Sequence, residues 1–168
     1  MIPVERNFLE LRDIKKLKFN SSKENKFLIK KIKPDFQLNK FFYKQVGKKH
    51  RWIDRLSWTD EKWISFISNK NLETYVISES KDLIGFFELL YNPELNETEI
   101  SYFGLLEEYI GKGIGGYALS EAIKKSFEKN IERVWLHTCT LDHPNALKNY
   151  IARGMRVFRK ENINILDS

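Results

Sequence analysis

The stretch that decides the fold is Tyr109-Ile110-Gly111-Lys112-Gly113-Ile114-Gly115-Gly116, which places four glycines within positions 111–116. It follows a strand predicted at 97–106 and opens an amphipathic helix predicted over 113–129. Glycine lets the backbone approach a ligand closely. The free N–H groups and the dipole at the start of a helix attract an anion, and Lys112 adds a positive charge. The turn therefore predicts a phosphate or pyrophosphate site, and a tight turn without a ligand is the alternative.

Two common nucleotide-binding folds do not fit this turn. The Walker pattern is absent, because no Gly-Lys-Ser/Thr occurs at the required spacing. A dinucleotide fold is disfavoured, because the strands predicted at 74–78, 83–91 and 97–106 are joined by short turns and form an antiparallel meander rather than β-α-β crossovers. In the last of these strands, alternation places Ile100, Tyr102 and Leu106 on one face and Phe103 and Leu105 on the other.

The segments before the meander predict a strand and two helices. Residues 1–25 are interpreted as an N-terminal extension with a short helix, and residues 27–32 as a strand. Asp35 is expected to cap a helix that ends at Gly47. A second helix, capped by Thr59 or Asp60, is expected to bury an apolar face of Trp63, Ile64 and Ile67.

The segments after the glycine turn complete a mixed α/β fold. The helix over 113–129 turns Ser120 toward solvent. A strand is predicted at 133–139, followed by a helix that Asp142 caps and Gly154 ends, and by a last strand from 155–158. The sequence predicts a central, mostly antiparallel twisted sheet flanked by helices.

Composition agrees with one domain over residues 1–168, with its core at 26–160. The chain has 29 Lys plus Arg against 23 Asp plus Glu, a formal net charge of +6, and 42% hydrophobic residues. Cys139 is the sole cysteine, which excludes a disulfide scaffold and a Cys-cluster metal site. No metal is expected.

The sequence also argues against several partners. It lacks the basic start and apolar stretch of a signal peptide, and no apolar run approaches the ~18 residues that span a bilayer. A cytoplasmic protein without a membrane partner is expected. Nucleic acid is disfavoured because the basic residues do not form one long stripe. A homodimer is left open.

The segment 99–105 followed by 110–115 resembles the core motif of the GNAT superfamily of N-acetyltransferases. Ile110 stands where that motif has Gln or Arg. A second element, with Ala146, Tyr150, Gly154 and Met155 at the family spacing, has His143 where Asn is usual. The resemblance covers about residues 26–160, and it implies that acetyl-CoA is the co-substrate.

In that family the turn's amides hold the pyrophosphate, and the edge of the preceding strand pairs with the pantetheine arm. The same strand supplies backbone N–H donors to the developing oxyanion. His143 contacts the coenzyme or, alternatively, caps the following helix. The resemblance therefore implies coenzyme-binding roles for Phe103, Gly104, Leu105, Ile110, Gly111, Lys112, Gly113, Ile114, Gly115, Gly116 and His143.

Acyl transfer to an amine needs a base and an acid. Glu97 and Glu99 are two apart on a strand, so they share a face. The resemblance aligns Glu99 with the catalytic glutamate of histone-type members and Glu97 with that of ribosomal-protein alanine acetyltransferases. Glu99 is preferred; Glu88 is a third candidate, and solvated carboxylates are the alternative. Tyr150 matches the tyrosine that protonates the leaving thiolate, and a core tyrosine is its alternative.

Three further groups receive weaker interpretations. His137 and Cys139 share a face near the end of the strand at 133–139. His137 is interpreted as a packed histidine or a contributor to the acceptor site, and Cys139 is not needed as a nucleophile, because direct transfer requires no acyl-enzyme. The basic run 48–51 is interpreted as a solvated loop, with contact to an anionic acceptor or to the coenzyme as the alternative.

The expected function is transfer of an acetyl group from acetyl-CoA to a primary amine by direct attack in a ternary complex. A small-molecule acceptor is favoured, and its identity is open. The alternatives are a protein or peptide acetyltransferase and a non-catalytic acyl-CoA-binding module.

Overall fold

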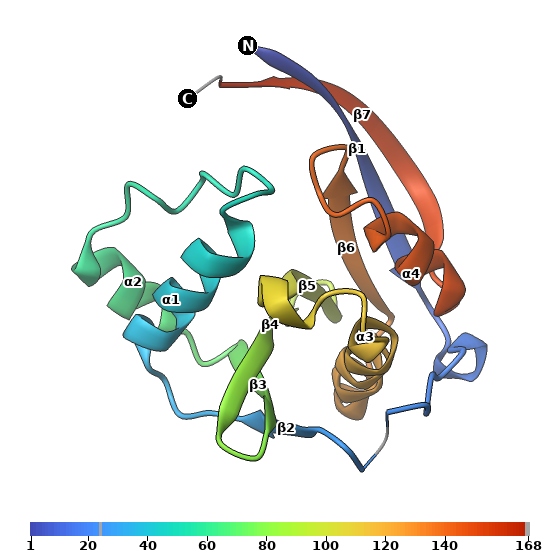
Figure 1. Ribbon diagram of the computed structural model, residues 1–168. Coiled ribbons are helices and arrows are strands. Elements are labelled where there is room, and N and C mark those ends of the chain that lie inside the picture. Colours follow the sequence, from blue (N-terminus) through green and yellow to red (C-terminus); the bar gives the residue numbers. More distant parts are fainter. Residues whose placement is uncertain (24, 167–168) are drawn as a thin grey trace.

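The computed structural model describes residues 1–23 and 25–166; Glu24, Asp167 and Ser168 lie outside the described residues. In the described part of the chain, seven strands form one sheet in the order β2-β3-β4-β5-β6-β1-β7. In Figure 1, α1 and α2 lie on one side of the sheet and α3 and α4 on the other. The strands are β1 (Ile2–Leu11), β2 (Leu28–Lys31), β3 (Leu72–Glu79), β4 (Asp82–Asn92), β5 (Glu97–Leu105), β6 (Arg133–Cys139) and β7 (Arg156–Ile165), and the helices are α1 (Phe36–Gly47), α2 (Asp60–Ile67), α3 (Ile114–Ser126) and α4 (Ala146–Ala152).

The structure of the N-terminal segment differs from the prediction. Residues 2–11 form strand β1 between β6 and β7, not a helix in an extension. Leu9 and Leu11 are buried in the sheet's core, and the helical spacing is confined to one 3-10 turn at Ile14–Lys16. Apolar residues two apart on a strand satisfy part of a helical pattern as well, and the pairing with β6 and β7 decides between the two. Figure 1 shows β1 running beside β7, with the start of β1 and the end of β7 at one end of the sheet.

The meander and the mixed α/β class are confirmed. Strands β3, β4 and β5 pair antiparallel, and β5 pairs parallel with β6. A register shift interrupts the pairing of β4 with β5. Ile100 pairs with Leu89 and Tyr102 with Glu88, so Ser101 forms a β-bulge. The bulge reverses the alternation of side chains. Ile100 therefore shares its face with Phe103 and Leu105, rather than with Tyr102 as the regular pattern predicted.

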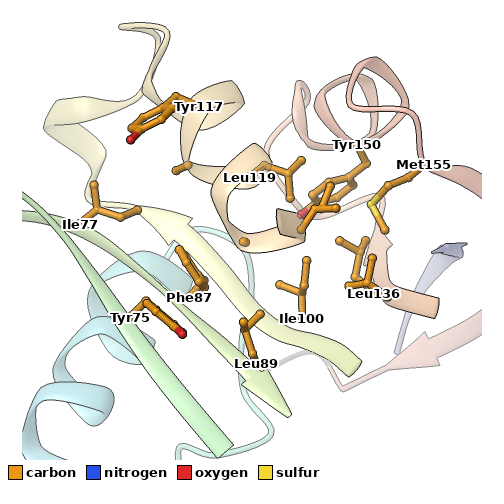
Figure 2. Packing of buried hydrophobic residues seen from close by; sticks show 14 of the residues in the cluster. Tyr75, Ile77, Phe87, Leu89, Ile100, Tyr117, Leu119, Leu136, Tyr150 and Met155 are labelled. Carbon is orange, nitrogen blue, oxygen red and sulfur yellow. The ribbon is translucent and has the colours of Figure 1, made fainter. Parts of the chain in front are cut away.

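The core lies on both faces of the sheet. On one face, side chains from β3–β6 pack against α3 and α4; Figure 2 shows Leu119 and Tyr150 beside Ile100 and Leu136. On the other face, Phe42 of α1 stacks on Phe86 of β4 with ring centroids 5.1 Å apart. Apolar packing on both faces makes β4 and β5 the rigid centre that positions the neighbouring loops.

Two of the three predicted N-terminal helix caps are confirmed. The Asp35 carboxylate accepts from the N–H groups of Gln37 and Leu38, and the Thr59 hydroxyl accepts from the N–H of Lys62. Asp142 does not cap α4, which starts at Ala146 after Asn145. Instead, the Asp142 carboxylate accepts from the Thr138 hydroxyl and the Cys139 N–H, closing the turn after β6.

Two helix faces differ from the expected patterns. Ile64 of α2 is 45% exposed, whereas Trp63 and Ile67 are buried as expected. Ser120 of α3 is buried rather than facing solvent, because the segment after β1 crosses this helix. Its hydroxyl donates to the Gly116 carbonyl at 2.7 Å and accepts from the Asn20 N–H at 2.9 Å. Across the described residues, the helices are all too short or too polar to cross a membrane.

Candidate active site

A cleft opens where two parallel strands separate. Among the described residues, β5 and β6 pair from Glu97↔Arg133 to Glu99↔Trp135 and then diverge. The cleft beyond has a volume of about 370 Å³. Residues 100–105 of β5 line one wall, and Leu136, His137 and Cys139 of β6 line the other. The edge of β5 that faces β6 is thus left without a strand partner along 100–105, and its backbone groups can pair with an extended ligand.

The glycine turn forms one end of this cleft, at the start of α3. Gly113 is the N-cap residue with φ +79°, and no side chain caps the first helical turn in the described structure. The backbone N–H groups at the start of α3 are therefore free to bind an anion. Gly111 has φ +81°, and a Cβ atom there would meet nothing within 4 Å. Gly111, Gly113, Gly115 and Gly116 line the cleft, so the backbone of the turn is accessible from it.

Most of the residues expected to bind the coenzyme line the cleft. Two do not: Ile114 is 2% exposed and packs in the core, and the Lys112 ammonium lies 5.5 Å from the Tyr109 ring centroid. Neither residue is among those that line the cleft. The expected residues that line the cleft are Phe103, Gly104, Leu105, Ile110, Gly111, Gly113, Gly115, Gly116 and His143.

His143 lies in the turn between β6 and α4, where Asn145 and not His143 is the N-cap residue of α4. Its ring lines the cleft, and its Nδ1 accepts from the Asn145 N–H at 3.1 Å. The histidine therefore holds the turn before α4 while it presents its other edge toward the cleft.

Tyr150 also lines the cleft, although it is only 8% exposed. Burial, and secondarily the negative charge of Asp142, raise the pKa of its hydroxyl above the usual value. The phenol is therefore protonated at neutral pH and can act as a proton donor.

The three candidate carboxylates occupy different environments, and none of them lines the cleft directly. Glu97 forms an ion pair with Arg133, with Oε2 2.7 Å from Nε. Glu88 is fully buried, and both its oxygens accept from Nη1 of Arg55, at 2.7 and 2.9 Å. Burial raises the pKa of Glu88, and the charge of Arg55 partly opposes that shift.

Glu99 differs from the other two carboxylates. It belongs to the last β5–β6 pair before the strands separate, next to the cleft residue Ile100. Burial raises the pKa of Glu99; the positive charge of Arg55 lowers it, and the charges of Glu88 and Glu97 raise it again. A carboxylate with a raised pKa is a better proton acceptor near neutral pH than an ordinary one.

Arg55 occupies an aromatic cage beneath the cleft. Its guanidinium carbon lies 4.2–5.6 Å from the ring centroids of five aromatic side chains. The Arg55 N–H also donates to the Tyr43 hydroxyl at 3.0 Å. This cage ties the start of α2 to α1 and so fixes the preceding loop, 50–54, against the cleft. Its members are Tyr43, Trp58, Trp63, Phe66 and Tyr102.

Several cleft residues were not identified from the sequence. Val4 and Arg6 lie on β1, which the sequence misassigned as helix, so no signal marked them. His50 and Arg51 belong to the basic run interpreted as a solvated loop, and both line the cleft. The others could have been found only from the fold, because they come from separate loops and turns: Trp52, Ile53, Asp54, Leu141, Asn145 and Asn149.

His137 and Cys139 face the cleft from β6. Burial, reinforced by the nearby positive charge of Arg6, lowers the pKa of His137, so its imidazole is neutral near pH 7. Burial and then Asp142 raise the pKa of the Cys139 thiol, which disfavours the thiolate form. This environment does not activate Cys139 as a nucleophile.

Comparison with protein families identifies one match. The model of the acetyltransferase (GNAT) family matches residues 35–155, well over half of the chain. That range includes β3–β6, the glycine turn and Tyr150. No curated protein matches the chain significantly.

Solved structures share the fold at low sequence identity. A GCN5-related N-acetyltransferase from Sphaerobacter thermophilus matches with a TM-score of 0.65 and 15% identity, covering 94% of this chain and 49% of that one. A GCN5-related N-acetyltransferase from Kribbella flavida gives 0.65 and 13%, covering 91% and 54%. An aminoglycoside acetyltransferase from an uncultured soil metagenomic sample gives 0.63 and 14%, covering 79% and 90%. The chain thus spans about half the length of the first two.

Proposed function

This chain belongs to the acetyltransferase (GNAT) family, and we propose that it transfers an acetyl group from acetyl-CoA to a primary amine by direct attack within a ternary complex. One observation carries the proposal. A single cleft runs along the unpaired edge of β5, and both the uncapped N-terminus of α3 and Tyr150 line it.

The cleft has the features that acetyl-CoA requires. The open backbone at Gly111 and Gly113 and the free amides of α3 would hold the pyrophosphate. The edge of β5 at 103–105 would pair with the amides of the pantetheine arm as an added strand would. The thioester would supply the activated acetyl group.

The chain's own groups would then move two protons. Glu99, acting through a water molecule, takes the proton from the attacking amine as the new C–N bond forms. Backbone N–H groups of 103–105 stabilise the oxyanion. As the C–S bond breaks, Tyr150 donates its proton to the leaving sulfur. Holding both reactants in one cleft would itself lower the barrier by several kcal/mol.

Glu99 is the proposed base because the other two candidates are engaged. Glu97 is paired with Arg133, and Glu88 with Arg55. No ion pair or side-chain hydrogen bond within the described residues engages Glu99, and it stands where the strands separate. His137, whose imidazole faces the cleft, is the second candidate, and variants of Glu99 and His137 distinguish the two.

A small-molecule acceptor fits the cleft better than a protein does. Residues 50–54, fixed by the Arg55 cage, line the cleft beside the sheet and narrow the approach to it. A protein or peptide substrate would need a more open groove. A non-catalytic acyl-CoA-binding module would share the glycine turn, but it would not need Glu99 or Tyr150.

Two measurements test the proposal. Acetyl-CoA should raise the thermal midpoint of the protein as its concentration increases, because it binds the folded state. A panel of amines assayed by release of free coenzyme thiol should then identify turnover. A protein that shows no shift at millimolar acetyl-CoA would contradict the site, and binding without turnover of any amine would favour the non-catalytic module.

A further inference from the structure

Arg6 places a positive charge on the wall of the cleft. It lies in β1, opposite Cys139 of β6 and Glu161 of β7, and its side chain lines the cleft wall. Its Nε is buried and has no hydrogen-bond partner among the described residues. The Arg6 charge is also weakly paired, since Nη1 is 3.9 Å from the nearest oxygen of Glu161. The guanidinium therefore has little internal compensation for its charge, which an anion bound in the cleft would supply.

Glu161 is engaged elsewhere. Its Oε1 accepts from Nη2 of Arg159, which approaches much more closely than Arg6 does. The Arg6 guanidinium can therefore bind a second anion through its Nη N–H groups, while Glu161 keeps its closer contact with Arg159. The group that best matches two adjacent N–H donors of arginine is a carboxylate.

A second unsatisfied polar group lies on the other wall. Ser101, the bulged residue of β5, lines the cleft, and its buried hydroxyl oxygen has no hydrogen-bond partner in the described structure. Ser101 thus adds a polar residue to the β5 wall of the cleft.

Formal charges of both signs line the described cleft in equal number. Arg6 and Arg51 carry positive charge, and the lining acids among the described residues are Asp54 and Asp142. Asp142 is already bound by the Thr138 hydroxyl and the Cys139 N–H. An acceptor with several ammonium groups would find one carboxylate, Asp54, left for them.

The phosphates of acetyl-CoA do not account for Arg6. The free amides that would hold the pyrophosphate belong to α3, which follows β5, whereas Arg6 lies two strands away in the order β5-β6-β1. The Arg6 guanidinium thus lies in the part of the cleft that remains for the acceptor.

We propose that the acceptor is a small primary amine that also carries a carboxylate, an amino acid or a close analogue, and that Arg6 binds that carboxylate. The inference rests on the proposed acetyltransferase function. It adds the chemical class of the acceptor and a substrate-binding residue on β1, outside the residues matched by the family model.

The test compares matched pairs of amines that differ only in the carboxylate: phenylalanine with phenethylamine, tryptophan with tryptamine, leucine with isoamylamine, and lysine with cadaverine. Coenzyme release is measured for the native protein and for Arg6→Gln, Arg6→Lys and Arg156→Gln. Arg156 is a matched control because its side chain is 73% exposed and does not line the cleft. Acetyl-CoA binding and the thermal midpoint are measured for each protein.

We expect at least one amino acid to exceed its decarboxylated partner in kcat/KM by about tenfold or more, the range of a charged hydrogen bond. Arg6→Gln should abolish that preference and leave the Kd for acetyl-CoA unchanged, Arg6→Lys should restore part of it, and Arg156→Gln should keep it. A preference that survives in folded Arg6→Gln, partners that react equally well, or no turnover of any amino acid by a protein that binds acetyl-CoA would overturn the inference. Weaker acetyl-CoA binding in Arg6→Gln would assign Arg6 to the coenzyme instead. Absence of acetyl-CoA binding in the native protein would overturn the proposed function itself.

Discussion

Ile100 and Tyr102 are two residues apart on β5, yet they lie on opposite faces of the sheet. Ile100 belongs to the core under α3, and Tyr102 packs on the α1 side, with its ring centroid 5.1 Å from that of Tyr43. The bulge at Ser101 produces this reversal, and the strands β5 and β6 stop pairing at the same point. One inserted residue therefore both opens the cleft and directs Tyr102 toward Arg55.

The Arg55–Glu88 pair should be important for stability. Arg55→Met leaves a fully buried carboxylate without its cation, so we expect a loss of about 3–5 kcal/mol in the free energy of unfolding, measured with urea. Glu88 would then titrate at a still higher pKa, since its first cause of elevation is burial.

A double variant separates charge from packing. Arg55→Met combined with Glu88→Leu removes both charges and should be more stable than Arg55→Met alone. Lys40→Met is the control, because Lys40 and Asp60 form an exposed pair at 3.2 Å and such pairs contribute about 0–1 kcal/mol. Equal losses for Arg55→Met and Lys40→Met would contradict a structural role for the buried pair.

Gly115→Asp tests the phosphate cradle without backbone strain. Gly115 lies in the first turn of α3, and a Cβ there would make an ordinary contact, 3.6 Å from Nδ2 of Asn149. Gly113 is less suitable, since its φ of +79° strains any side chain. The aspartate should raise the Kd for acetyl-CoA at least tenfold by repulsion, as measured by titration calorimetry.

Two controls accompany this variant. Gln45→Glu adds the same charge on an exposed face of α1 and should leave the Kd unchanged. Gly115→Ala adds bulk without charge and should weaken binding less than Gly115→Asp. Unaltered affinity in a folded Gly115→Asp protein would mean that the pyrophosphate does not bind at the start of α3.

Glu99→Gln should lower kcat by about 10²–10⁴, the usual contribution of a general base. In the native protein kcat/KM should fall at acidic pH, and the midpoint of this acidic limb should lie above the ordinary carboxyl pKa of about 4.3, because burial raises the pKa of Glu99. Activity should fall as the pH drops through this limb, and Glu99→Gln should abolish it.

Glu97→Gln is the matched comparison, because Glu97 lies two residues before Glu99 on the same strand. It breaks the ion pair with Arg133, so it should reduce stability while retaining most of kcat. If His137→Gln rather than Glu99→Gln removed the acidic limb, the imidazole would be the base.

The sequence predicted the central strands and the glycine turn better than the N-terminal strand β1. The meander, the caps at Asp35 and Thr59 and the glycine turn depend on local turn and capping chemistry, which neighbouring residues specify. Strand β1 was missed because its identity depends on pairing with β6 and β7, more than 100 residues away in the chain. The candidate site shows the same difference, because the glycine turn was predicted from local sequence, whereas Arg6 lies on the missed strand β1. The alternation rule also failed at Ser101, because a bulge leaves no sign in a sequence with apolar residues on both faces.

Tyr150→Phe joins the proposed chemistry to a change in pH-dependent stability. The variant loses the proton donor to the leaving sulfur, so kcat should fall about tenfold or more while the Kd for acetyl-CoA stays within about twofold.

The raised pKa of Tyr150 means that the folded state keeps this proton above pH 10, where the unfolded chain has lost it. Stability therefore falls as the pH rises above about 10, by about 1.4 kcal/mol per pH unit for each such tyrosine. Tyr75 and Tyr102 have raised pKa values as well, so urea unfolding at pH 9, 10 and 11 should show a steep decline. Tyr150→Phe should reduce that slope by about one proton's contribution. A variant with native kcat would remove Tyr150 as the acid, whereas an unchanged slope with reduced kcat would place its hydroxyl in contact with solvent.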